Sequence, residues 1–107
     1  MIWDRLLRSA GEYWGAARSP KWSAVRKAFV RANPYCAACG TTRELEVHHV
    51  VPFHIDASRE LDTANLMTLC QDCHLYIGHL KGWTRHNPHA VDDAALMLTR
   101  FSAKSGN

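Results

Sequence analysis

The sequence predicts a small α+β domain that is held together by a zinc ion and flanked by a helix at each end. Two observations predict the core: the cysteine pairs Cys36-x-x-Cys39 and Cys70-x-x-Cys73, and the β-branched run LEVHHVVP at residues 45–52. Apolar residues at three- and four-residue spacing before and after this core predict the helices. At 107 residues we expect one domain, residues 1–107, with its core at about 22–80.

Two helices are expected before the cysteines. Trp3, Leu6 and Trp14 belong to an apolar pattern that predicts an N-terminal helix at residues 2–17, which would pack on the core. Ser19-Pro20 is typical of an N-cap followed by the first helical residue, and Asn33-Pro34 would end that second helix. Its basic residues lie away from its apolar stripe. They form either an ordinary solvated face or a phosphate-contacting surface.

The four cysteines favour a metal over two disulfides. Each pair has a two-residue gap, which lets both thiolates bind one tetrahedral ion, and the pairs are separated by 30 residues, positions 40 to 69. Gly40 directly follows Cys39, where a tight turn with positive φ is needed. The spacing therefore predicts a closed structural Zn²⁺ site with Cys36, Cys39, Cys70 and Cys73 as ligands.

The predicted strand carries two adjacent histidines, His48 and His49, in an otherwise apolar run that Pro52 ends. Burial of an imidazole has a desolvation cost unless something binds it, and neighbouring side chains on a strand point to opposite faces. The two rings are therefore expected to have different roles. The ordinary alternative is one exposed histidine and one that is satisfied by a hydrogen bond.

Two more helices are expected after the second cysteine pair. A short helix should start near Gln71 and stop at Gly78. A last helix is expected at residues 91–102, with Asp92 and Asp93 in its first turn, where the helix dipole favours negative charge. The inward side chains of that helix are expected to be Leu96, Met97 and Phe101.

The zinc site should bring distant histidines together. It fixes both ends of the 40–69 segment, so His74, next to Cys73, is expected near His48 and His49. A neutral imidazole is a good ligand for a divalent ion, and a free one is a good base near neutral pH. This combination suits metal-assisted hydrolysis, particularly of a phosphodiester.

The order Cys-x-x-Cys-Gly, then EVHHVVP, then ELDTANLMTLCQDCH resembles the HNH endonucleases over about residues 22 to 80. The resemblance implies a ββα-metal, treble-clef-like core. It also implies His49 as the general base that activates water, and His48 and His74 as ligands of one catalytic divalent ion. Asn65 would match the middle Asn, whose hydrogen bonds hold the loop that orients His49.

The implied reaction is hydrolysis with one metal ion (Mg²⁺, Mn²⁺, Ni²⁺ or Zn²⁺) that leaves a 5′-phosphate and a 3′-hydroxyl. His79 is a candidate third ligand if the Gly78 break brings it round, and otherwise a DNA contact or an exposed ring. His54 is a weaker candidate for substrate or metal contact. Glu46 and Asp72 are candidates to orient a ligating imidazole.

A formal charge of +3 is compatible with an anionic partner, and we expect DNA, bound mainly through its phosphates with little sequence preference. A partner protein is a candidate source of specificity. No apolar run approaches the roughly 20 residues of a membrane helix, and a cytoplasmic location is expected. The alternatives are a non-catalytic zinc module that binds nucleic acid and an RNA nuclease on the same motif. The candidate nucleic-acid-binding residues are Arg26, Lys27, Arg31, Arg43, Lys81 and Arg85.

Overall fold

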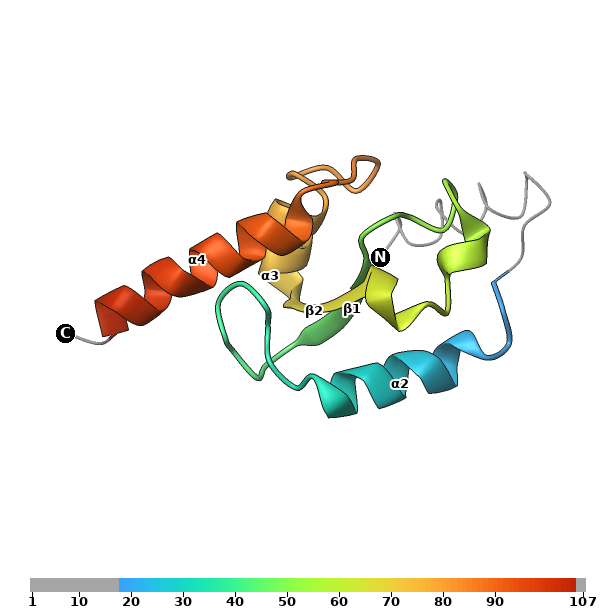
Figure 1. Ribbon diagram of the computed structural model, residues 1–107, viewed down its shortest axis with the longest axis horizontal. Coiled ribbons are helices and arrows are strands. Elements are labelled where there is room, and N and C mark those ends of the chain that lie inside the picture. The colour runs from blue at the N-terminus through green and yellow to red at the C-terminus, as the bar shows by residue number, and fades with distance from the viewer. Residues whose placement is uncertain (1–17, 106–107) are drawn as a thin grey trace.

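The computed structural model describes residues 18–105, so the predicted helix at residues 2–17 lies outside the described part. The described chain forms a two-stranded sheet surrounded by helices (Figure 1). The elements are α2 (Trp22–Ala32), β1 (Leu45–His49), the 3₁₀ turns η1 (Ala57–Arg59) and η2 (Thr63–Asn65), β2 (Leu66–Cys70), α3 (Gln71–Cys73), the π-helical turn η3 (His74–Gly78) and α4 (Ala90–Ser105). In this part of the chain no helix is long and apolar enough to span a membrane.

The sheet pairs β1 with β2 in antiparallel register, with His48 opposite Met67 and His49 opposite Leu66. All five residues of β2 are buried, which agrees with its nearly continuous apolar sequence. The connection between the strands contains η1 and η2. Asp56 and Asp62 cap these two turns, since each carboxylate accepts a backbone N–H two residues further on.

Helix α2 begins at Trp22, later than the Ser19-Pro20 prediction, with Lys21 as its N-cap residue. Ser19 instead caps the turn before the helix: its Oγ accepts the N–H of Lys21 at 3.1 Å, and its carbonyl accepts the N–H of Trp22 at 3.1 Å. The C-terminal boundary agrees with the prediction, because Asn33 follows the last helical residue and bonds back to Phe29.

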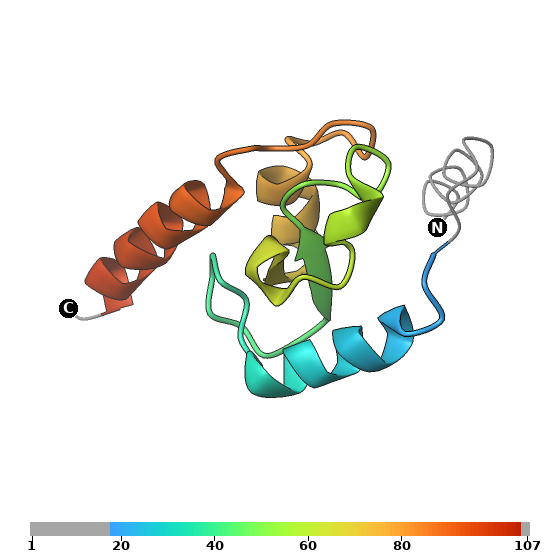
Figure 2. The same ribbon diagram turned by 45° about the vertical axis from the view of Figure 1, so that its right-hand side comes forward.

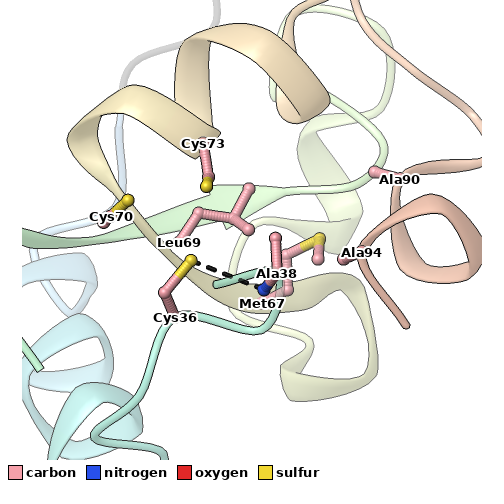
Figure 3. Packing of buried hydrophobic residues seen from close by; sticks show 8 residues of the cluster. All are labelled: Cys36, Ala38, Met67, Leu69, Cys70, Cys73, Ala90 and Ala94. Atoms are coloured by element: carbon pink, nitrogen blue, oxygen red, sulfur yellow. Dashed lines mark hydrogen bonds between the residues drawn. The ribbon is translucent and has the colours of Figure 1, made fainter. Parts of the chain in front are cut away.

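The hydrophobic core lies at the cysteines and not along the helices (Figure 3). Leu69 at the end of β2 is fully buried, and the thiols of Cys36, Cys70 and Cys73 lie around it. Ala90 and Ala94 bring the first turns of α4 against this cluster. A core this small makes a metal that joins its cysteines important for stability.

Helix α4 runs from Ala90 to Ser105, slightly beyond the predicted 91–102, and has Asp92 and Asp93 in its first turn as predicted. The prediction that Leu96 and Phe101 point inward is wrong, because they are 53% and 42% exposed. The first turns pack through small alanines and Met97 packs against the core as predicted, whereas the end of the helix extends away from the body of the domain (Figures 1 and 2).

Candidate active site

The four cysteines converge as their spacing predicts. Their sulfur atoms all lie within 4.8 Å of one another, and the Sγ atoms of Cys39 and Cys70 are 3.7 Å apart. Gly40 has a φ of +78°, in agreement with the tight turn expected after the first pair. Two Cys-x-x-Cys turns that face each other provide the four-thiolate donor set of a structural zinc site, so these residues can hold a structural metal.

Backbone N–H groups already favour the thiolate form at Cys36. Burial alone would raise the pKa of Cys36, but N–H donors, including those of Cys39 and Ala38 at 3.4 Å from Sγ, lower it to about 7. Burial and the neighbouring thiols raise the pKa of Cys73. A bound cation would offset that effect, since metal binding requires the deprotonated thiol.

Three histidines form a second cluster that could hold a metal ion. His48 comes from β1, and His74 and His79 come from the two ends of η3. One ring nitrogen of each lies within 4.8 Å of the others. The π-helical turn explains how two residues five apart meet: the N–H of His79 donates to the carbonyl of His74 at 3.1 Å, and the two ring centroids lie 4.9 Å apart.

Hydrogen bonds orient the rings of this cluster so that lone pairs face one another. The Nδ1–H of His74 donates to Oε1 of Glu46 at 2.8 Å, and the Nδ1–H of His79 donates to the carbonyl of Arg85 at 2.7 Å. Their Nε2 atoms therefore carry lone pairs, only 3.2 Å apart. Two such acceptors at this distance repel each other unless a cation or a proton lies between them.

His48 completes the cluster as a neutral ligand. Its side chain is 1% exposed, and burial, together with the neighbouring His74 and His79, lowers its pKa to about 2. Within the described residues the buried Nε2 of His48 has no hydrogen-bond partner. A divalent ion would satisfy this atom, so the site fits a metal bound by three imidazoles, with positions left open for water or substrate.

His49 lies in a different environment from its neighbour. Its ring stacks against Trp22 of α2 with 4.4 Å between the centroids, and its Nε2–H donates to the carbonyl of Glu60 at 2.9 Å. Because a carbonyl can only accept, the neutral ring carries its lone pair on Nδ1. Burial lowers the pKa of His49, and the Arg18 guanidinium adds to this effect, so the ring is neutral and can accept a proton at neutral pH.

Asn65 holds the loop that follows the histidines. Its fully buried side chain accepts the N–H of Val51 at 2.8 Å and donates to the carbonyls of Val51 at 3.0 Å and Arg59 at 3.3 Å. These bonds join Val51, just after β1, to Arg59. The next residue, Glu60, has the carbonyl that accepts the His49 N–H. The amide is therefore well placed to fix the loop around that ring.

The histidines open into a cleft of about 500 Å³. Among the six predicted nucleic-acid-binding residues, Arg26 lines this cleft, and the other five are exposed outside it. His54 also lines it, and Asp72 is exposed. Sequence reasoning did not identify Arg18 or Trp83 as cleft residues. In the sequence, only their residue types indicate a role in binding, because neither residue belongs to a motif with fixed spacing. The lining includes Arg18, Trp22, Arg26, Phe53, Trp83 and the side chains of His48, His49, His54, His74 and His79.

Comparison with known proteins identifies the family of this chain. Residues 35–80 match the family model of the HNH endonucleases. Among solved structures, the HNH endonuclease of the deep-sea thermophilic bacteriophage GVE2, crystallised with a manganese ion, is 31% identical. The match covers 68% of this chain and 78% of that one, with a TM-score of 0.48. No curated protein matches significantly. The family model and the sequence identity show that this chain belongs to the HNH endonuclease family.

Proposed function

We propose that this protein is a metal-dependent endonuclease that hydrolyses DNA phosphodiester bonds with His49 as the general base. One observation carries the proposal: a neutral imidazole with its lone pair on Nδ1 lines the same cleft as three imidazoles that can hold a metal. A base beside a Lewis acid is the arrangement that phosphodiester hydrolysis requires. Nucleic-acid binding alone would not require it.

In the proposed reaction, Nδ1 of His49 takes a proton from water as that water attacks phosphorus. The Glu60 carbonyl, which accepts the Nε2–H, then stabilises the imidazolium that forms. Asn65 keeps the loop, and with it this carbonyl, in place. A divalent ion held by His48, His74 and His79 would supply Lewis-acid stabilisation of charge on the phosphate oxygens. The bond to the 3′-oxygen breaks and this oxygen takes a proton from solvent water, which leaves a 3′-hydroxyl and a 5′-phosphate.

Two metals are assigned to two sites in this proposal. Zn²⁺ at the four cysteines would have protein ligands at all four positions, with none open to substrate, and would stabilise the fold. Mg²⁺, Mn²⁺, Ni²⁺ or Zn²⁺ serves at the histidines, and the manganese in the phage relative supports including Mn²⁺. Reduced thiolates at the zinc site suit the cytoplasm. The nuclease core is assigned to residues 22–80 of a single domain.

We propose weak sequence preference and contacts mainly to phosphates, which the cations Arg18 and Arg26 in the cleft lining support. Arg26 would contact phosphate, and binding would depend strongly on salt. A partner protein would then supply any sequence specificity. DNA is the assigned substrate, and RNA is the alternative that the assay below separates.

The test is relaxation of supercoiled plasmid by wild type and His49→Ala, each with Mg²⁺, Mn²⁺, Ni²⁺, Zn²⁺ or EDTA. Metal-dependent nicking or linearisation should disappear in a folded His49→Ala protein, and the exposed variant His89→Ala serves as the matched control. Labelled RNA in the same assay determines the nucleic acid that is cut. If folded, zinc-loaded wild type binds DNA but does not cut it with any of these metals, the proposal is wrong and the protein is a nucleic-acid-binding module.

A further inference from the structure

Glu60 is a buried acid that begins the motif ELDTANLMTLCQDCH, and the family resemblance assigns it no role. It lies in the loop between β1 and β2 and is only 4% exposed. A carboxylate loses its hydration when it is buried, so it is tolerated only where partners replace the lost water. Its partners therefore indicate what its position requires.

The Glu60 carboxylate binds the start of the described chain, about forty residues away in sequence. The N–H of Ser19 donates to its two oxygens at 3.0 and 3.3 Å, and the Arg18 guanidinium lies 3.6 Å from Oε2. Arg18 is itself held over the ring of Phe53, 4.5 Å from its centroid. The segment that leads into α2 is thus attached to the loop between the strands (Figure 1).

The backbone of the same residue binds the proposed base, since the carbonyl of Glu60 accepts the Nε2–H of His49. The other constraint on that ring is Trp22, three residues after Ser19 and in the first position of α2. The contacts therefore form a closed circuit. His49 contacts the Glu60 backbone, the Glu60 carboxylate binds Ser19, Ser19 caps the turn before Trp22, and Trp22 packs on His49.

We propose that Glu60 is a positioning residue: its carboxylate locks the entry to α2 so that Trp22 and the Glu60 carbonyl hold the His49 ring in one orientation and one tautomer. The inference rests on the proposed role of His49 as base. Loss of the carboxylate frees the Arg18–Ser19 segment, and with it both Trp22 and the loop that carries the Glu60 carbonyl. The expected consequence is a slower chemical step with unchanged DNA affinity.

The experiment compares wild type, Glu60→Gln and Glu60→Ala in the full chain. Asp92→Ala serves as control, because it removes one negative charge from an exposed position on α4. Nitrogen-15 NMR of the histidine side chains reports the tautomer of His49. Single-turnover cleavage reports the chemical step, and binding of the same DNA with EDTA present reports affinity.

Glu60→Ala should convert His49 from the Nε2–H form to a mixture of tautomers and slow cleavage about 10- to 100-fold, as is usual for loss of an orienting partner. Glu60→Gln, which keeps an acceptor for Ser19, should remain closer to wild type. The DNA dissociation constant should change no more than in Asp92→Ala. If Glu60→Ala does not fold, Glu60→Met, which keeps the size of the side chain but has no carboxylate, makes the same comparison.

The proposal is overturned if His49 keeps its tautomer in Glu60→Ala or Glu60→Met, or if cleavage in these variants slows only as far as DNA binding weakens. The NMR measurement does not depend on activity. A wild-type protein that cuts no DNA would therefore refute the proposed function, while the link between Glu60 and His49 would still be tested by the tautomer.

Discussion

The imidazole of His48 lies directly against the backbone of Gly78. A Cβ atom added at Gly78 would lie 2.9 Å from Cε1 and 3.0 Å from Nδ1 of that ring. Because His48 is 1% exposed, the ring cannot move aside into solvent. The absence of a side chain at residue 78 therefore lets η3 approach β1 closely enough for His74 and His79 to meet His48.

Gly78→Ala should accordingly disturb the three-histidine cluster. The added methyl group must displace a buried ring, and overpacking of this kind costs about 1–3 kcal/mol of unfolding free energy. We expect lower stability in chemical denaturation and weaker divalent-ion binding in calorimetry of the zinc-loaded protein. Gly82→Ala is the matched control, since its Cβ would meet only the flexible Arg85 side chain at 3.5 Å. Equal behaviour of the two variants would contradict the prediction.

His79→Ala should weaken binding of the divalent ion. It removes one of three converging imidazoles, and even loss of an orienting partner of a ligand typically costs about 10–100-fold in metal affinity. The measurement is calorimetric titration of zinc-loaded protein with Mn²⁺ or Ni²⁺. The exposed His89→Ala should bind as wild type does. Unchanged affinity in His79→Ala would leave His48 and His74 as the only protein ligands among the three.

Cys36→Ser should unfold the domain. The core is small and centred on the cysteines, and a structural zinc can contribute on the order of 10 kcal/mol of folding free energy. We expect loss of bound zinc by elemental analysis and loss of the cooperative thermal transition in circular dichroism. Strong chelation of wild type should have the same effect, and added zinc should reverse it. A variant that melts at the wild-type temperature without zinc would refute the structural role.

Asn65→Ala should lower both stability and cleavage. It leaves the part-buried N–H of Val51 without its acceptor and removes two donated bonds, which should cost about 2–4 kcal/mol when each hydrogen bond contributes about 0.5–1.5 kcal/mol net. Urea denaturation measures the loss. Asn33→Ala, at the exposed end of α2, serves as control and should cost less than about 1 kcal/mol. Comparable losses in the two variants would argue against a special role for Asn65.

Arg26→Gln should reduce DNA binding more than Lys27→Gln does. The residues are adjacent on α2, but Arg26 lines the cleft whereas Lys27 is exposed outside it. Loss of one phosphate contact should reduce the slope of log affinity against log salt by about 0.9 on duplex DNA. The measurement is fluorescence anisotropy over a salt series with His49→Ala as the common background. A larger effect at Lys27 would place the DNA on the outer face of α2.

The sequence predicted the four-cysteine site and the strand with its two histidines because both depend on local geometry. Two cysteines three positions apart can share one ion wherever the chain turns, and a β-branched run is extended in most contexts. The opposite environments of His48 and His49 also follow from strand geometry, since neighbouring side chains point to opposite faces. These are properties of a few consecutive residues.

Predictions made from helical periodicity were less successful. A regular α-helix places residues four apart on one face, so the five-residue step from His74 to His79 did not predict whether the two rings meet. The π-helical turn brings them together, with 4.9 Å between the ring centroids. Leu96 and Phe101 were expected to be buried, but they are 53% and 42% exposed, whereas Met97, expected on the same side, packs against the core. Periodicity identifies the apolar residues of a helix, but it does not show which of them the rest of the domain covers.

By itself, the sequence determined the convergence of the four cysteines, the strand that carries the histidines and the family to which the chain belongs. Only the tertiary structure decided which other residues surround the reactive ring. Glu60 meets Ser19 across 41 positions of sequence, and Trp83 meets His74 and His79 through a loop with no regular pattern. Such contacts arise when separate segments pack together. No local spacing records them, because their distances are set by the packing of the whole chain.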